Sequence, residues 1–137
     1  RRMRASIFLD QLLEGKGVLS EGGVVLILPD ARDGLSRGIP HAFHGRTRMF
    51  KTGFAELALE TGAPVIPLSI SVDVRTRTVT VRFLEPLDAG TDALSRAARV
   101  EGLVRQYIAF LDAEWVRCPG SVDMKLVETH LGSPPAG

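Results

Sequence analysis

The spacing of apolar residues near the start of the chain predicts a helix followed by a strand. Residues 4–14 place four apolar side chains on one helical face, namely Ile7, Phe8, Leu12 and Leu13. Gly15 and Gly17 predict the end of this helix. A continuous apolar run over residues 24–28 then predicts a strand that is buried on both faces and ends at Pro29 and Asp30.

The middle of the chain predicts a loop and a second helix. Residues 31–50 show little periodicity, and such a long stretch inside a domain is usually a functional loop. The helix that follows presents one apolar face, formed by Phe50, Phe54, Leu57 and Ala58. Gly62 predicts its end, because glycine is the usual residue just after a helix.

Two strands and a long helix are predicted in the second half. Residues 64–72 indicate a buried strand whose one face carries Ile66, Leu68, Ile70 and Val72. After a turn at residues 73–77, residues 78–83 alternate strictly. They predict an antiparallel, half-exposed strand that turns Val79, Val81 and Phe83 inward.

A loop at residues 86–90 leads to the last helix, for which Thr91 is the expected N-cap. The apolar face of this helix is formed by Leu94, Ala97, Ala98, Leu103, Val104, Tyr107, Ile108, Leu111 and Trp115. The helix is expected to end at residues 118–120, and the tail after Ser133 is expected to fray.

This order of elements predicts an α/β fold with a mixed, mainly parallel sheet flanked by helices. A helix between two strands suggests a βαβ unit, and the hairpin partner would then lie at a sheet edge. No internal repeat and no linker marks a second domain in the 137 residues.

Composition excludes some function classes. The chain has 17 Lys and Arg against 16 Asp and Glu, a formal net charge of +1, so it lacks the basic surplus of nucleic-acid-binding domains and no nucleic-acid partner is expected. One cysteine excludes a disulfide framework and a cysteine-rich zinc site. No apolar run approaches the roughly 20 residues that a transmembrane helix needs.

Positive charge is concentrated between residues 30 and 51. Five basic against two acidic residues give this segment a local charge of +3, and they are Asp30, Arg32, Asp33, Arg37, Arg46, Arg48 and Lys51. The segment follows the carboxyl end of a predicted strand, where α/β sheets place their ligands. Arginine binds phosphate bidentately, and the start of the next helix near Thr52 offers backbone N–H donors. The segment therefore predicts a phosphate-binding site.

A structural interpretation of the same residues stays open. The arginines could pair with Asp30 and Asp33 in a solvated loop, and Asp30 could cap a turn. His41 and His44 have a spacing that metal ligands use, but no third ligand is nearby, so no metal site is expected. Cys118 lacks a neighbouring base, which favours a structural thiol.

Several segments, taken in order, resemble motifs of the lysophospholipid acyltransferase superfamily. Residues 22–30 look like its strand and acidic turn. Residues 43–46 (FHGR) resemble the Phe-Phe-Gly element of the branch that acylates lipid A and bacterial glycolipids such as phosphatidylinositol mannosides. Residues 61–67 (TGAPVIP) are similar to its Gly-x-Pro-[Ile/Val]-x-Pro strand entry, and residues 83–87 to the segment that follows. The likeness covers roughly residues 12–119.

The resemblance implies transfer of an acyl group from acyl-CoA or acyl carrier protein to a hydroxyl of a membrane phospholipid or glycolipid. It implies no cofactor and a peripheral location on the cytoplasmic side of the cell membrane. By position, Asp30 matches the motif acid and Arg46 the arginine after the Phe-Phe-Gly element. The expected substrate-binding set is Asp30, Arg32, His44, Gly45, Arg46, Arg48 and Lys51, of which Arg32, Arg48 and Lys51 are chosen for their charge.

The catalytic His-x4-Asp/Glu motif of this superfamily is missing from the chain. In the family its histidine is the general base on the acceptor hydroxyl, and the carboxylate orients the imidazole. The residues found five positions after each histidine are Arg46, Met49 and Pro135. Ala31 also stands where the family has glycine or glutamine.

We therefore expect residues 1–119 to be the C-terminal part of a glycerolipid-acyltransferase-like domain, followed by a tail over residues 120–137. The catalytic motif would lie upstream, so little activity is expected from this chain alone, and its catalytic residues are unknown. An upstream in-frame His-x4-Asp/Glu motif would favour the enzyme, and a start codon near Arg1 would favour a binding module.

Two other functions stay open. The first is a non-catalytic module that binds an anionic lipid or phosphate. The second is a hydrolase with His44 as its base, although no Gly-x-Ser-x-Gly nucleophile motif is present.

Overall fold

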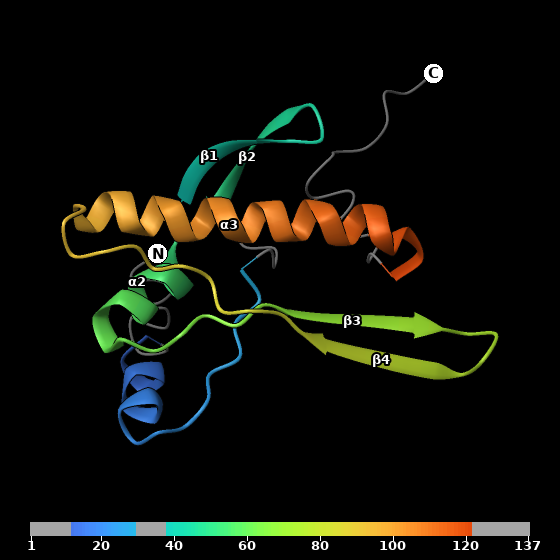
Figure 1. The fold of residues 1–137 in the computed structure, drawn as a ribbon, viewed down its shortest axis with the longest axis horizontal. Helices are drawn as coiled ribbons and strands as arrows, with labels where there is room; N and C mark the ends of the chain where they lie inside the picture. Colours follow the sequence, from blue (N-terminus) through green and yellow to red (C-terminus); the bar gives the residue numbers. More distant parts are fainter. Residues whose placement is uncertain (1–11, 30–37, 122–137) are drawn as a thin grey trace, which may run out of the picture.

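The computed structural model describes residues 12–29 and 38–121. Its labelled elements are β1 (Gly38–Phe43), β2 (Arg46–Lys51), α2 (Gly53–Thr61), β3 (Leu68–Asp73), β4 (Thr78–Phe83), α3 (Arg96–Arg117) and the 3-10 helix η1 (Pro119–Ser121). A helix over residues 12–20 precedes them. Helix α3 runs along the long axis, with the β1–β2 hairpin on one side and α2 and the β3–β4 hairpin on the other (Figure 1).

The core lies where α3 meets α2 and the β1–β2 hairpin. Its buried side chains are Phe43, Phe50, Phe54, Ala55, Val100, Leu103, Val104, Ile108 and Leu111. The α3 members recur at helical spacing and therefore share one face. The predicted stripe is confirmed over residues 103–111, whereas Ala97 and Ala98 are exposed.

The start of α3 differs from the prediction. Ser95 is the N-cap, and its side chain accepts a hydrogen bond from the Ala98 N–H at 3.2 Å. Thr91 instead accepts a backbone bond from Leu94 in a preceding turn. The prediction of Thr91 is wrong because threonine and serine are both good N-caps, and the helix begins at Arg96, directly after Ser95. The predicted helix end is confirmed, since Cys118 is the C-cap.

Helix α2 is confirmed with the predicted face and end. Phe54, Leu57 and Ala58 are buried, and Gly62 adopts φ 71° while its N–H donates to the Ala58 carbonyl. This left-handed conformation carries no Cβ penalty in glycine. Phe50 belongs to β2 and reaches the same core from the strand.

The first described helix continues beyond the predicted end. Residues 12–20 are helical, and Gly15 is a buried position inside the helix. A Cβ at Gly15 would lie 3.3 Å from the Leu57 Cδ2 atom, so this glycine allows close packing on α2. The ion pair between Lys16 and Glu60 joins the same two helices. The predicted positions Ile7 and Phe8 lie outside the described residues.

The predicted buried strand at residues 24–28 is wrong. The segment has no regular secondary structure in the part of the chain that the structure describes, and Val24 and Leu26 are 90% and 73% exposed. An apolar run becomes a buried strand only when neighbouring strands and covering layers are present. The described residues supply neither.

A β-hairpin replaces most of the predicted loop at residues 31–50. Strands β1 and β2 pair antiparallel, with Phe43 opposite Arg46 and His41 opposite Arg48. The two turn residues, His44 and Gly45, have φ values of 47° and 76°, which is typical of the type I′ turn of tight hairpins. His-Gly is an uncommon version of the usual Asn-Gly signal, so the turn was missed.

The mixed α/β composition is confirmed, but the mainly parallel sheet is not found. Within residues 12–29 and 38–121 both sheets are two-stranded and antiparallel. The predicted antiparallel pairing of β3 and β4 is confirmed, with Ser69 opposite Arg82 and Ile70 opposite Val81. The parallel βαβ arrangement required strand pairing by residues 24–28, and these residues pair with nothing in the described structure.

The orientation of β4 is the reverse of the prediction. Val79, Val81 and Phe83 are exposed, whereas Arg82 points toward Glu114 of α3. The polar side of the β3–β4 hairpin therefore faces the helix. Its apolar side, formed by Leu68, Ile70, Val72, Val79, Val81 and Phe83, lies on the opposite face, and all but half-buried Leu68 are exposed.

Candidate functional site

Two of the predicted site residues share one face of the β1–β2 hairpin. Arg46 and Arg48 are two positions apart on β2, so their side chains lie on the same side as Phe50. Phe50 is buried in the core, which identifies this side as the inner face. The strand period thus brings both arginines toward the core edge, and His41 lies opposite Arg48.

The Arg48 guanidinium is unusual because part of it is buried without a partner. Its Nε and Nη2 atoms are inaccessible to solvent and make no hydrogen bond within the described residues. A buried donor without an acceptor costs about 1–3 kcal/mol, and more when it is charged. Arg48 therefore carries hydrogen-bonding capacity on the inner face of the hairpin that no described residue uses.

Lys51 lies at the end of β2, on the opposite face from Arg48, directly before the start of α2. Thr52 is the N-cap of α2, and its side chain makes no capping hydrogen bond. The first amides of a helix lack internal partners and attract negative charge. Glu56 in the first turn is paired with Arg96, with Glu56 Oε2 and Arg96 Nη2 3.0 Å apart.

His44 is anchored to α3 on two sides. Its Nε2 atom lies 3.0 Å from Asp112 Oδ1, and its ring stacks on Trp115 with the centroids 5.5 Å apart and the planes 20° apart. Phe43 contacts Trp115 edge-on at 5.1 Å. Sequence reasoning missed Asp112, because nothing local links an exposed helix position to a hairpin turn. His44 and Gly45 thus hold the turn, and His44 presents a carboxylate-bound imidazole.

An apolar cavity of about 440 Å³ lies beside the same tryptophan. Its apolar lining includes Phe54, Leu57, Ile66, Leu68, Tyr107 and Leu111. Trp115 lines the cavity and also stacks on His44, so one side chain connects the apolar space with the turn of the basic hairpin. A space of this size is within the range of small-molecule sites, about 300–1,000 Å³.

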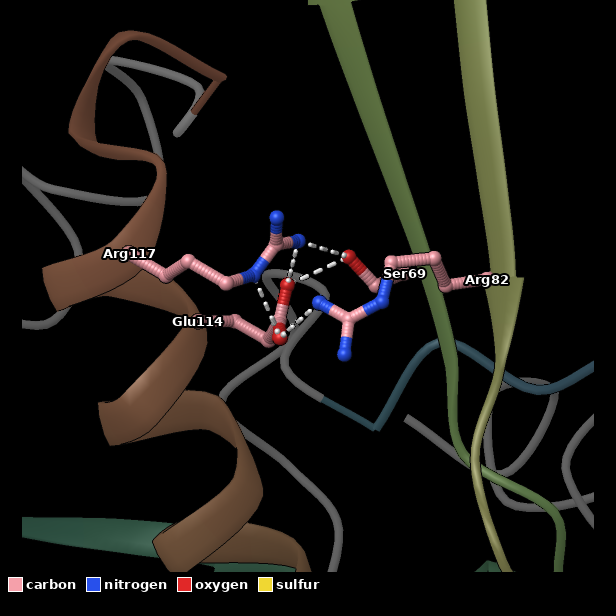
Figure 2. A network of polar contacts seen from close by, with 4 residues as sticks. All are labelled: Ser69, Arg82, Glu114 and Arg117. Atoms are coloured by element: carbon pink, nitrogen blue, oxygen red, sulfur yellow. Dashed lines mark hydrogen bonds and ion pairs between the residues drawn. The ribbon is translucent and has the colours of Figure 1, made fainter.

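A network of charged side chains borders the cavity near the C-terminal end of α3. Figure 2 shows Glu114 between Arg117 and Arg82, with Ser69 of β3 beside it. Arg117 Nε lies 3.0 Å from Glu114 Oε1, Arg82 Nη1 lies 3.3 Å from the same oxygen, and Ser69 Oγ donates to Glu114 Oε2. The hydrogen bonds from Arg117 are the main cause that lowers the pKa of Glu114 to about 2, so the carboxylate stays ionised at neutral pH.

Two predicted site residues, Asp30 and Arg32, lie outside the described residues, as do Asp33 and Arg37. Cys118 is half-buried at the end of α3, next to the cavity. Among the residues that the structure describes, no three His, Cys, Asp or Glu side chains gather as metal ligands would. No described helix is both long and apolar enough to cross a membrane.

Comparison with known families decides the class of this protein. A family model described as Acyltransferase matches residues 1–71, which is just over half of the 137 residues. The chain belongs to the acyltransferase family. The match contains the basic hairpin, all of α2 and the first part of β3. No curated protein and no solved structure matches the chain.

Acyl transfer is therefore the general function that this acyltransferase chain is expected to serve, and an acyl donor and a lipid acceptor are the partners that the family suggests. The resemblance, which is expected to cover roughly residues 12–119, is confirmed at the level of the acyltransferase superfamily by a match over residues 1–71. The branch that modifies lipid A and glycolipids stays a prediction.

Proposed function

We propose that this acyltransferase acts on a lipid acceptor that carries a phosphate group, and that Arg48 binds this phosphate. The single observation that carries the proposal is the pair of buried, unpartnered N–H groups of Arg48. A phosphate oxygen is a strong acceptor for a guanidinium, and two parallel hydrogen bonds are the usual geometry. Lys51, Arg46 and the uncapped start of α2 add positive potential nearby.

The remaining residues of the proposed site have supporting roles. His44 and Gly45 hold the hairpin turn against Trp115, and Asp30 and Arg32 complete the acceptor site from the segment before β1. The donor is acyl-CoA or acyl carrier protein, and the acceptor is a membrane phospholipid or glycolipid. The apolar cavity next to Trp115 suits an acyl chain, because its lining is dominated by apolar side chains.

The proposed domain organisation follows from the motif content. Residues 1–119 form the C-terminal part of the acyltransferase domain, and residues 120–137 form a tail. The general base is supplied by a His-x4-Asp/Glu motif outside these 137 residues, since no histidine of the chain has an acidic residue five positions later. The protein acts peripherally on the cytoplasmic side of the membrane, within the branch that acylates lipid A or glycolipids.

The phosphate site is tested with a water-soluble acceptor fragment. Glycerol 3-phosphate is titrated into the chain while the fluorescence of Trp115, its single tryptophan, reports the environment of the hairpin turn. We expect saturable binding by the wild type and at least a tenfold loss in Arg48→Gln, because one charge-assisted contact contributes about 1.5–3 kcal/mol.

Arg105→Gln is the matched control. Arg105 is an exposed arginine of α3 that pairs with Glu101 one turn away, so its loss should leave phosphate binding unchanged. Equal affinities for Arg48→Gln and Arg105→Gln would exclude Arg48 from the site. If Asp30→Asn with Asp33→Asn strengthens binding, these carboxylates compete for Arg48, which is the structural interpretation left open by the sequence.

Acyl transfer is tested separately with acyl-CoA and a lysophospholipid, a phosphatidylinositol mannoside or a lipid A precursor. We expect Arg46→Ala and Asp30→Ala to lower transfer by the protein that carries the His-x4-Asp/Glu motif. Transfer that is unaffected by both changes contradicts the site assignment. Phosphate binding without any transfer, even when the motif is present, favours the non-catalytic module.

A further inference from the structure

The β3–β4 hairpin exposes an apolar face that the acyltransferase activity does not explain. We call its side chains Ile70, Val72, Val79, Val81 and Phe83 the outer face. All five are exposed, and Phe83 reaches 74%. Their strand positions alternate with Ser69, Ser71, Arg82, Thr80 and Thr78, which form the opposite, polar side. The two sides are therefore completely segregated.

The arrangement is the reverse of what a buried hairpin shows. The polar side is turned toward α3 and held there by Glu114, which contacts Ser69 and Arg82 together. The apolar side is left in water, although antiparallel sheets normally pack their apolar side on the core. Exposed apolar surface that is gathered on one flat face marks an interaction site.

The far end of the hairpin carries positive charge. Val74, Arg75 and Arg77 form its exposed turn, and Val74 is 81% exposed. Neither arginine takes part in the ion pairs found between described residues. The adjacent Asp73 carboxylate accepts the N–H groups of Arg75 and Thr76, and these bonds are the main cause that lowers its pKa.

We propose that the outer face and the basic turn of the β3–β4 hairpin dock on the surface of an anionic lipid bilayer. Apolar side chains beside exposed arginines are the combination that binds the boundary between headgroups and acyl chains. The hairpin runs alongside α3, and its turn projects beyond the C-terminal end of that helix (Figure 1). The choice of lipid over protein rests on the proposed lipid acceptor.

The docking also connects the bilayer with the cavity. Leu68 and Ile70 belong to the apolar side of the hairpin and line the apolar cavity as well. A hairpin that lies on the bilayer therefore brings this part of the cavity lining to the lipid boundary. An acyl chain would reach the cavity from the membrane without crossing water.

The test measures binding to vesicles of equal parts phosphatidylglycerol and phosphatidylcholine by co-sedimentation. We expect Val81→Asp to lower partitioning about tenfold, because it places a charge where the docked hairpin would bury an apolar side chain in the bilayer. Thr80→Asp is the matched control: it places the same charge at the neighbouring position, on the polar side of β4. It should leave partitioning within about twofold of the wild type.

The basic turn is tested with a variant that leaves both strands intact. Arg75→Gln with Arg77→Gln should weaken binding to the anionic vesicles about 25-fold, since each basic residue near such a surface contributes about fivefold. The same variant should bind vesicles of pure phosphatidylcholine as the wild type does. Added salt should weaken only the part of the vesicle binding that depends on Arg75 and Arg77.

Two results would overturn the inference. One is equal partitioning of Val81→Asp and Thr80→Asp while both keep the wild-type circular dichroism. The other result is a dimer of the wild type in sedimentation velocity that Val81→Asp converts to monomer, while vesicle binding stays unchanged. A second copy of the chain would then be the partner that covers the outer face. Glycerol 3-phosphate binding separates this test from the proposed function: Val81→Asp should retain it, and Arg48→Gln should retain vesicle binding.

Discussion

Glu114 contacts three side chains at once and joins two parts of the molecule that are distant in sequence. It pairs with Arg117 on its own helix and with Arg82 on β4, and it accepts the hydroxyl of Ser69, which is 45 residues away. Removing the charge of this carboxylate, whose side chain is 15% exposed, would leave two arginines uncompensated, which is destabilising. This residue fixes which side of the hairpin faces α3.

Replacement of Glu114 should therefore cost stability. We expect Glu114→Gln to lower the free energy of unfolding by about 1–3 kcal/mol, measured by urea denaturation. Glu101→Gln is the control, because Glu101 forms an exposed pair with Arg105 within α3 and should cost about 0.5 kcal/mol or less. A Glu114 variant as stable as the Glu101 variant would contradict the role of the network.

The same carboxylate should make stability depend on pH in the acid range. Its pKa is about 2 in the folded chain against an ordinary 4.5, so folding favours the ionised form. The contribution is fully present above pH 4.5 and is lost as the pH falls toward about 2. Urea denaturation across this interval should show that the free energies of unfolding of the wild type and Glu114→Gln approach each other as the pH falls. A difference that persists unchanged near pH 2 would speak against this carboxylate as its source.

At the scale of single elements, replacement of glycine by alanine should change the stability of the chain in opposite directions at two positions. Gly62 ends α2 with φ 71°, where a Cβ is strained, so Gly62→Ala should destabilise the chain by about 1 kcal/mol. Gly102 lies inside α3, and an added Cβ would meet nothing within 4 Å, so Gly102→Ala should stabilise the chain by about 0.5–1 kcal/mol. Thermal unfolding of both variants checks the signs, and two shifts in the same direction would contradict the argument.

The tight turn of the β1–β2 hairpin determines where the basic side chains of β2 lie. Both turn residues have positive φ, which fixes a two-residue connection and sets the register that places Arg48 opposite His41. The contact of His44 Nε2 with Asp112 Oδ1 and the stacking of the imidazole ring on Trp115 then fix the turn on α3. The basic side chains are therefore positioned by a strand pair and not by a loose loop.

At the scale of the whole molecule, we expect local stability against opening to differ between the helical core and the β3–β4 hairpin. Apolar packing is concentrated around Leu103 and Val104, whereas the described side-chain hydrogen bonds between the β3–β4 hairpin and α3 link Ser69 and Arg82 with Glu114 and Arg117. We expect amide hydrogen exchange to be slowest in the middle of α3 and markedly faster in β3 and β4. Vesicles of phosphatidylglycerol should slow exchange in the hairpin selectively. Uniform protection of both regions without lipid would contradict this picture.

Local pattern was enough to predict several elements, and these share a physical reason. The faces of α2 and of the central part of α3, the stop at Gly62 and the pairing of β3 with β4 depend on residues close in sequence. The acyltransferase resemblance also rests on short ordered motifs, and the family match over residues 1–71 confirms it. Arg48 was chosen for its charge, but its buried, unpartnered state depends on how β2 packs.

The sequence by itself determined where helices and strands form wherever periodicity and turn residues act locally, and it determined the family. Only the tertiary structure decided how apolar faces are used, because that depends on partners far along the chain. Val24 and Leu26 have an ideal strand pattern but lie exposed, since no described strand pairs with them. Val81 alternates as an inward residue but faces water, because Glu114 binds the opposite side of its strand.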